Sequence, residues 1–273
     1  MVTPEAHPVL RTAAEAALTA YHDARAAYDR AALAEYVADG ADGTPTMRID
    51  VLVESAILAA IEGTAANALS EETGFVDRGS PVTLVMDPLD GSANAAAGVP
   101  LTAFAGAIAV DGEFTEGLVV WLDTGRSWWA ARGRPTGLRT SGRTALDGAA
   151  VSLLRPRFDV PGAAGAWRAV AERAGRVRIL STSCLEAALV AEGSTDAFAD
   201  AASDTHRLVD IAASVVLAEA AGGAVRDVRG RPIECDTDLT RRWSGIVAAT
   251  PALADEIAET LRAAAGEPVT PWR

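Results

Sequence analysis

The chain has 273 residues, of which 49% are hydrophobic and 22% charged, a composition typical of a globular protein with a full core. Its net charge of −13 argues against a nucleic-acid or anionic-membrane surface, because both need clustered positive charge. All 24 Lys and Arg positions are arginines, so no lysine can serve as a general base or phosphate ligand.

The two cysteines, Cys184 and Cys235, have no CxxC spacing, so the sequence predicts neither a zinc ribbon nor a disulfide framework. The N-terminal segment lacks the basic-then-apolar pattern of a secretion signal, and the longest weakly polar run, residues 98–110, is too short to span a bilayer. We therefore expect a cytoplasmic protein without membrane or nucleic-acid partners.

Predicted elements change character halfway along the chain. Apolar residues at three- and four-residue spacing predict helices at 4–38, 47–69, 166–175, 183–194, 208–223 and 251–266. Extended segments are predicted at 79–88, 177–181, 196–200, 224–230 and 244–250. Residues 100–133 are predicted to form antiparallel hairpins, because "DGE" and "DTG" turns separate their apolar runs. The sequence thus predicts one globule, 1–273, with an α+β half (1–150) and an α/β half (151–273).

Two aspartates, Asp87 and Asp90, lie where the strand predicted at 79–88 ends, in "VMDPLDGSAN". Carboxylates three residues apart repel each other, and clustering them is costly unless a positive charge lies between them. No arginine lies in this segment, so a divalent cation is the natural partner, and all-oxygen ligation indicates Mg²⁺ rather than zinc or copper. An EF-hand loop is excluded, because its third and fifth positions would be Leu89 and Gly91.

Other acids lie at element ends. Glu71 is in the turn "LSEETGF", Asp50 is beside a helix start, and Asp210 is in the first turn of a predicted helix. An acid there gains about 0.3–1 kcal/mol from the helix dipole, so the last two are also explained as caps. The segment "DGSANAAAG" can open a helix whose first free N–H groups, from Gly91 and Ser92 onward, suit a phosphate. Metal-holding acids beside such a helix start predict a phosphate-ester site.

Three segments, "SEETG", "MDPLDGSAN" and "VDIAASVVLAEAAGG", resemble in order and spacing the signatures of the inositol monophosphatase superfamily of Mg²⁺-dependent phosphomonoesterases. The loop "GADGTPTMRID" and the stretch "GVPLTAF" are most similar to archaeal-type members, which hydrolyse both inositol monophosphate and fructose 1,6-bisphosphate. The similarity runs from about Gly40 to the C-terminal helix. It implies a layered αβαβα sandwich, of mixed α+β and α/β character, and commonly a homodimer.

The resemblance also implies roles for individual residues. The metal ligands would be Glu71, Asp87, the carbonyl of Leu89, Asp90 and Asp210, with Asp50 near a third, weaker position. Glu71, Asp90 and Ser92 would be catalytic, with Ser92 helping Glu71 to orient the attacking water; a hydroxyl that satisfies a helix-start N–H is the alternative for Ser92. In-line attack of metal-bound water on phosphorus then needs no covalent intermediate. Two or three Mg²⁺ ions are implied, with Mn²⁺ as a substitute and Li⁺ as an inhibitor.

Substrate contacts are expected at the helix start and in the second half of the chain: Gly91, Ser92, Arg155, Arg157, Ser183, Asp200 and Arg207. For the first two arginines an ordinary surface position is the alternative. His206, four residues before Asp210, suggests a metal pair, but its polar surroundings favour a solvated histidine.

The substrate is expected to be a small phosphorylated polyol or sugar. Ala41, Ala93 and Val209 depart from the family pattern and give a smaller-sided, less cationic pocket than a bisphosphate needs. Inositol monophosphate is therefore the first expectation and fructose 1,6-bisphosphate the second. Histidinol phosphate, a 3′-phosphoadenosine nucleotide, a natural-product intermediate and a non-catalytic member that binds a phosphorylated ligand remain alternatives.

Overall fold

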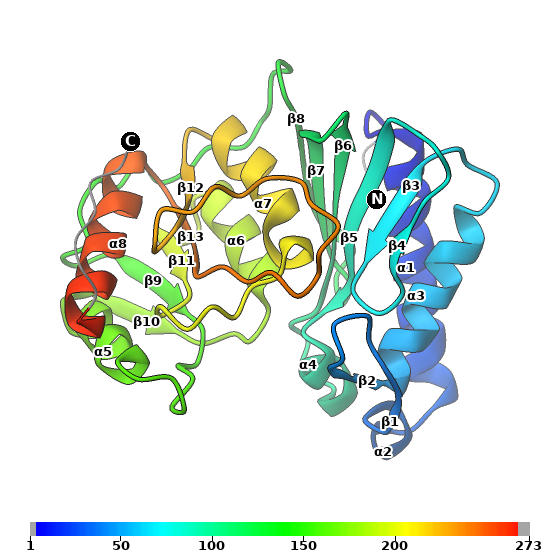
Figure 1. The fold of residues 1–273 in the computed structure, drawn as a ribbon, viewed down its shortest axis with the longest axis horizontal. Helices are drawn as coiled ribbons and strands as arrows, with labels where there is room; N and C mark the ends of the chain where they lie inside the picture. The colour runs from blue at the N-terminus through cyan, green and yellow to red at the C-terminus, as the bar shows by residue number, and fades with distance from the viewer. Residues whose placement is uncertain (1–3, 267–273) are drawn as a thin grey trace.

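Helices and sheets alternate in five layers across the computed structural model, which describes residues 4–266 (Figure 1). A helical layer, a six-stranded sheet, a central pair of helices, a five-stranded sheet and a second outer helical pair follow one another. The αβαβα sandwich predicted from the resemblance is thereby confirmed. Within the described residues, no helix is long and apolar enough to cross a membrane.

The six-stranded sheet has the order β4-β3-β5-β6-β7-β8. Its strands are β3 (Asn67–Ser70), β4 (Gly74–Val76), β5 (Val82–Asp90), β6 (Ala103–Val110), β7 (Glu113–Trp121) and β8 (Arg126–Ala131). Antiparallel pairing of β6, β7 and β8 confirms the hairpins predicted at 100–133. The outer face is covered by α1 (Pro8–Ala27) and α3 (Arg48–Ala60), because α1 presents Leu10, Ala14 and Tyr21 along one buried stripe.

The central helices, α6 (Ser183–Ala191) and α7 (Leu208–Ala220), lie between the two sheets. Residues 208–218 of α7 are all buried, as expected for a helix that is apolar on every side and enclosed by protein. α7 approaches β7 at Gly117, where an added Cβ would lie 2.6 Å from the carbonyl oxygen of Ala213. The close contact of helix and sheet depends on the absence of a side chain at this position.

We expect Gly117→Ala to lower the free energy of unfolding by about 1–3 kcal/mol, because the methyl group would push α7 off the sheet. Gly137→Ala is the matched control: an added Cβ there has no heavy atom within 4 Å, so the change should stay within about 0.5 kcal/mol. Urea unfolding of both variants measures the difference. Equal effects of the two substitutions would contradict the packing argument.

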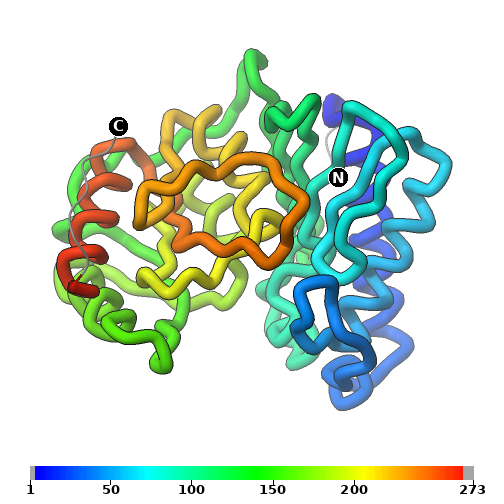
Figure 2. The backbone as a smooth tube through the Cα atoms, in the orientation of Figure 1, coloured from blue at the N-terminus to red at the C-terminus, as the bar shows by residue number. Residues whose placement is uncertain are grey.

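The five-stranded sheet has the order β10-β9-β11-β13-β12, with β9, β10 and β11 parallel and β13 antiparallel to its neighbours. Its strands are β9 (Ala150–Leu153), β10 (Arg176–Arg178), β11 (Ala197–Ala199), β12 (Ala224–Asp227) and β13 (Gly245–Ala248). α5 (Ala163–Arg173) and α8 (Pro251–Ala265) cover its outer face. Figure 2 shows the long loop between β12 and β13 crossing in front of the central helices toward the other sheet.

Two predicted helices are wrong at their C-terminal ends. The segment predicted as helix 4–38 breaks into α1, α2 (Arg30–Leu33) and β1 (Tyr36–Asp39), which pairs with β2 (Pro45–Met47). The helix predicted at 47–69 ends at Ala60, and after a turn residues 67–70 form β3, which pairs with β5 on one side and β4 on the other. Tertiary pairing overrides local helix propensity there. Strand β9 was not predicted either.

Candidate metal and phosphate site

Asp87 and Asp90 lie at the C-terminal end of β5, in a part of the strand that does not pair regularly with β6. Asp87 is opposite Ala105 and Asp90 opposite Ala103, so three residues of β5 span the distance of two on β6. Residues i and i+3 of a regular strand point to opposite faces, but this bulge turns both carboxylates to the same side. The sheet thus presents two acids together where it ends.

The backbone then turns at Gly91 into the short helix α4 (Ser92–Ala97). Gly91 has φ +86°, and a Cβ there would lie 2.8 Å from the carbonyl oxygen of Leu101, so glycine is required on both grounds. The Ser92 hydroxyl donates to the carbonyl oxygen of Leu89 at 3.2 Å. Ser92 also interacts with the Asp50 carboxylate, which places it between two predicted ligands.

Four acids from three distant segments converge at this strand end. Ligand atoms of Glu71, Asp87 and Asp210 lie within 4.8 Å of one another, as do those of Asp87, Asp90 and Cys184. Glu71 follows β3, and Asp210 is in the first turn of α7. Asp87 is only 2% exposed and Asp210 8%. Apart from the thiol, the donor set is entirely oxygen, which fits a hard divalent cation.

Asp90 is held by the N-terminus of α6. Its carboxylate accepts hydrogen bonds from the Thr182 hydroxyl at 2.5 Å, the Ser183 amide at 3.1 Å and the Cys184 amide at 2.8 Å. Asp90 therefore caps α6 in addition to facing the other acids. Ser183, predicted as a substrate contact, contributes its backbone N–H to this arrangement.

Burial and mutual repulsion raise the pKa of the acids. Burial, followed by repulsion from Asp210 and Glu72, raises the pKa of Glu71 to about 8, against the attraction of Arg207. Burial and the neighbouring Glu71, Asp90 and Asp210 raise the pKa of Asp87 well above its usual value. Such a cluster disfavours its own ionisation, and a bound divalent cation would reverse that preference.

Asp90 and two acids outside the converging four, Asp50 and Glu72, follow the same pattern. Burial raises the pKa of Asp50 and of Asp90 to about 6, although hydrogen bonds from Ser92 and Thr182, respectively, act in the opposite direction. Burial, with repulsion from Asp50, raises the pKa of Glu72 to about 7. The unfavourable electrostatics therefore extend beyond the four converging acids.

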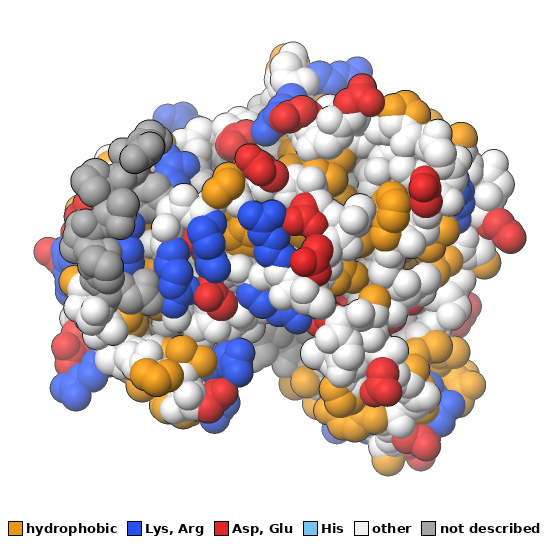
Figure 3. Space-filling view, viewed as in Figure 1, with side chains coloured by type: hydrophobic (Ala, Val, Ile, Leu, Met, Phe, Trp, Pro, Cys, Tyr) orange, Lys and Arg blue, Asp and Glu red, His pale blue; other side chains and the backbone are white. Residues whose placement is uncertain are grey.

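Arg207 lies inside this acidic cluster. Its guanidinium contacts Glu71 at 2.5 Å, Asp210 at 3.3 Å and Asp42 at 3.5 Å. Asp42 also accepts a 2.7 Å ion pair from Arg242, so the loop between β1 and β2 is joined to the loop between β12 and β13. Figure 3 shows arginine side chains gathered over this second loop, beside acidic ones. The site is thus bordered by cations despite the acidic net charge.

Other predicted substrate contacts lie apart from the acids. Arg155 stacks over the ring of Phe158, and Arg157 pairs with Asp159 at 2.8 Å on the surface. Asp200 is 0% exposed, and its carboxylate accepts hydrogen bonds from Ser203 and Thr205. Asp200 thus orders its own turn, and its predicted contact with substrate stays a prediction.

The expectation of a solvated His206 is wrong. The side chain is 1% exposed, its Nδ1 accepts the Gly245 amide, and its ring packs edge-on against Phe198. Its backbone bridges to Trp243, which draws the histidine into the core. His206 belongs to no group of candidate metal ligands within residues 4–266.

Three residues around the site were not predicted from the sequence. Thr182 donates to Asp90, Asp42 accepts from the arginines, and Glu54 accepts from the turn after Glu71. Glu54 follows Asp50 by four residues, a spacing that places both on one helix face and was a usable signal. Thr182 and Asp42 lie in loops whose partners are distant in sequence, so no local pattern identifies them.

Comparison with known proteins agrees with this geometry. The model of the inositol monophosphatase family matches residues 5–265. A fructose-1,6-bisphosphatase/inositol-1-monophosphatase of Methanothermobacter thermautotrophicus is 32% identical over 83% of this chain and 87% of its own. The inositol-1-monophosphatase ImpA of Mycolicibacterium smegmatis is 30% identical over 78% of this chain and 79% of its own. The crystal structure of the extragenic suppressor protein suhB of Bartonella henselae superposes with a TM-score of 0.78 at 23% identity, covering 93% of this chain and 97% of that one.

Proposed function

This chain belongs to the inositol monophosphatase family of phosphoric monoester hydrolases, and we propose that it hydrolyses a small phosphorylated polyol or sugar with Mg²⁺. The observation that carries the proposal is the convergence of Glu71, Asp87 and Asp210, with Asp90 beside them, at the start of α4. Buried carboxylates in this number need a cation, and the adjoining helix start offers N–H groups to a phosphate.

We assign Glu71, Asp87, the Leu89 carbonyl, Asp90 and Asp210 as metal ligands, with Asp50 near a further position. When bound, the ions supply Lewis-acid activation and neutralise phosphate charge. Ser92 is held between Leu89 and Asp50. Together with Glu71, it orients the water that attacks phosphorus.

The cationic side of the site suits an anionic substrate. Arg207 lies among the acids and is fixed from two sides. We assign its guanidinium to the phosphoryl group, together with the backbone amides of Gly91 and Ser92 at the start of α4. Arg155 and Arg157, engaged with Phe158 and Asp159, are assigned to the more distant part of the substrate.

Inositol monophosphate is the first substrate proposed and fructose 1,6-bisphosphate the second. The Methanothermobacter thermautotrophicus relative is named for both activities, and the Mycolicibacterium smegmatis relative is named for the inositol monophosphatase activity alone. Together they support placing inositol monophosphate first. The trimmed side chains at Ala41 and Ala93 favour a substrate with one phosphate. Histidinol phosphate, a 3′-phosphoadenosine nucleotide and a natural-product intermediate are the other candidates of this class.

Phosphate release across a substrate panel tests the proposal. The panel contains inositol 1-phosphate, fructose 1,6-bisphosphate, histidinol phosphate, a 3′-phosphoadenosine nucleotide and several sugar monophosphates, each with Mg²⁺, Mn²⁺ or EDTA. We expect Mg²⁺-dependent turnover, highest with inositol 1-phosphate and inhibited by Li⁺. Absence of turnover with every compound, together with a ligand-induced rise in melting temperature, would favour a non-catalytic phospho-ligand-binding protein.

We also propose a homodimer that acts in the cytoplasm. Val177 and Ile179 are exposed on or beside β10, which is an edge strand with one free side, and an apolar edge favours pairing with a second copy. Light scattering coupled to size-exclusion chromatography measures the mass, and a mass of one chain would contradict the dimer.

A further inference from the structure

Glu54 is a buried acid with an unusual set of partners. It lies on α3, is 4% exposed and directs its carboxylate at the turn that follows β3. One oxygen accepts the backbone N–H groups of Glu72 and Thr73, both at 3.1 Å. The other accepts the Thr73 hydroxyl at 2.7 Å. The turn next to Glu71 is therefore held by three hydrogen bonds to one side chain.

No ion pair within residues 4–266 involves Glu54. Its nearest charged neighbour in the turn, Glu72, is also an acid and is repelled by it. A buried carboxylate without a cation is costly, and an apolar side chain of similar volume would avoid that penalty. Unlike an apolar side chain, the carboxylate accepts the three hydrogen bonds that hold the turn.

These bonds act on the orientation of Glu71. The N–H of Glu72 belongs to the peptide group that follows Glu71, so fixing it fixes the direction in which the Glu71 side chain leaves the backbone. Glu71 reaches from this turn to Asp87 and Asp210 on two other elements. A small rotation of the turn would move its carboxylate out of that group.

We propose that Glu54 is a positioning residue that fixes the Glu71–Glu72 turn and thereby aims Glu71 at the metal. The inference rests on the proposed metal-dependent function and adds to it a residue that supports a ligand without binding metal. Side chains that orient metal ligands typically change metal affinity or activity by about 10–100-fold when they are replaced. The effect of Glu54 is expected in the same range.

Isothermal titration with Mg²⁺ tests this on the full-length protein. Glu54→Leu keeps most of the side-chain volume but removes both acceptor oxygens, so all three donors of the turn lose their acceptor and Mg²⁺ affinity should fall by about 10–100-fold. Thr73→Val removes one of the three bonds and should give a smaller loss, whereas Thr73→Ser keeps the hydroxyl and should restore wild-type affinity. This pair keeps the inference testable if Glu54→Leu fails to fold.

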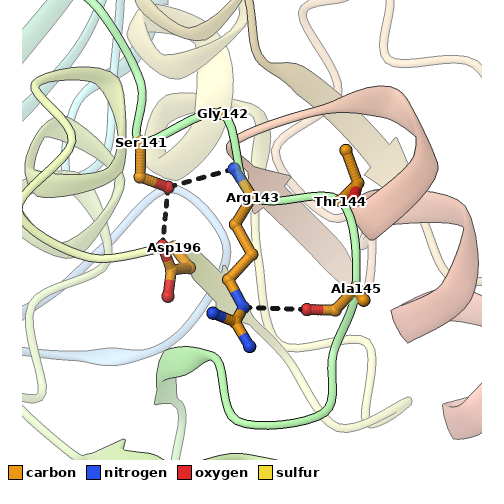
Figure 4. Close-up of a pocket in the computed structure, with 6 residues that line it drawn as sticks. All are labelled: Ser141, Gly142, Arg143, Thr144, Ala145 and Asp196. Carbon is orange, nitrogen blue, oxygen red and sulfur yellow. Dashed lines mark hydrogen bonds between the residues drawn. The ribbon is translucent and has the colours of Figure 1, made fainter.

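Asp196→Asn is the matched control for a purely structural carboxylate. Asp196 accepts the Ser141 hydroxyl at 2.6 Å and the Ala150 amide at 2.7 Å, in a surface pocket away from the acids (Figure 4). The Asp196→Asn substitution should lower the melting temperature and leave Mg²⁺ affinity unchanged. A folded Glu54→Leu protein with wild-type Mg²⁺ affinity would overturn the role of Glu54 alone. A wild-type protein that binds no Mg²⁺ would overturn the proposed function itself.

Discussion

Asp87→Asn should lower kcat/KM for phosphate release by about 10³-fold or more, which corresponds to about 4 kcal/mol of transition-state stabilisation. The same substitution should stabilise the metal-free protein at alkaline pH. Asp87 is 2% exposed and faces Glu71, Asp90 and Asp210, so its negative charge is unfavourable whenever no cation is bound. An amide has the same shape without that charge, and activity and stability therefore change in opposite directions.

Asp90→Asn is the comparison for Asp87→Asn, because it also removes one acid of the cluster but should lower stability instead of raising it. Asp90 accepts hydrogen bonds from Thr182, Ser183 and Cys184 at the start of α6, and the amide would leave one or more of these donors without an acceptor. We expect comparable loss of activity but a lower melting temperature in EDTA. Steady-state kinetics and thermal melts of both variants make the comparison. Wild-type kcat/KM in Asp87→Asn, or equal destabilisation by both, would contradict the assignment.

The acidic cluster could be predicted from the sequence because the repulsion between two of its carboxylates is evident within one short segment. Asp87 and Asp90 are three residues apart in a segment that contains no arginine, and a glycine turn follows. That pattern has few explanations other than a cation. The bulge that turns both side chains to one face could not be predicted, because it depends on the register between β5 and β6.

The surroundings of the cluster depend on contacts between distant segments. Asp42 and Arg242 form an ion pair although they are 200 residues apart in sequence, and no local spacing predicts such a pair. β3 follows an Ala-containing segment that favours helix, and its residues form a strand because they pair with β4 and β5. The substrate role predicted for Asp200 came from resemblance alone, and its actual hydrogen bonds are with its own turn.

The last prediction concerns pH: without metal, the protein should lose stability as pH rises from about 5 to about 8. Asp50, Glu71, Glu72 and Asp90 have pKa values raised to between about 6 and about 8 by burial. A raised pKa means that the folded state keeps a proton that the unfolded state has released. Stability then falls with pH above the unfolded pKa and levels off above the folded one, by up to about 1.4 kcal/mol per pH unit for each such group.

Mg²⁺ should reduce this slope, because the metal binds the deprotonated acids and its apparent affinity rises with pH. A residual slope should remain from Glu72, which is not assigned to the metal, and from Glu186. Glu186 is buried, accepts the amides of Leu180 and Thr182, and has its pKa raised by burial to about 8. Thermal melts from pH 5 to 8.5 in EDTA and in Mg²⁺, for wild type and Glu186→Gln, separate the two contributions. The metal-dependent part should persist in Glu186→Gln, while the residual slope in Mg²⁺ should shrink. A melting temperature in EDTA that rises with pH would show that the acids are already ionised in the folded protein, and the electrostatic argument for the cation would then fail.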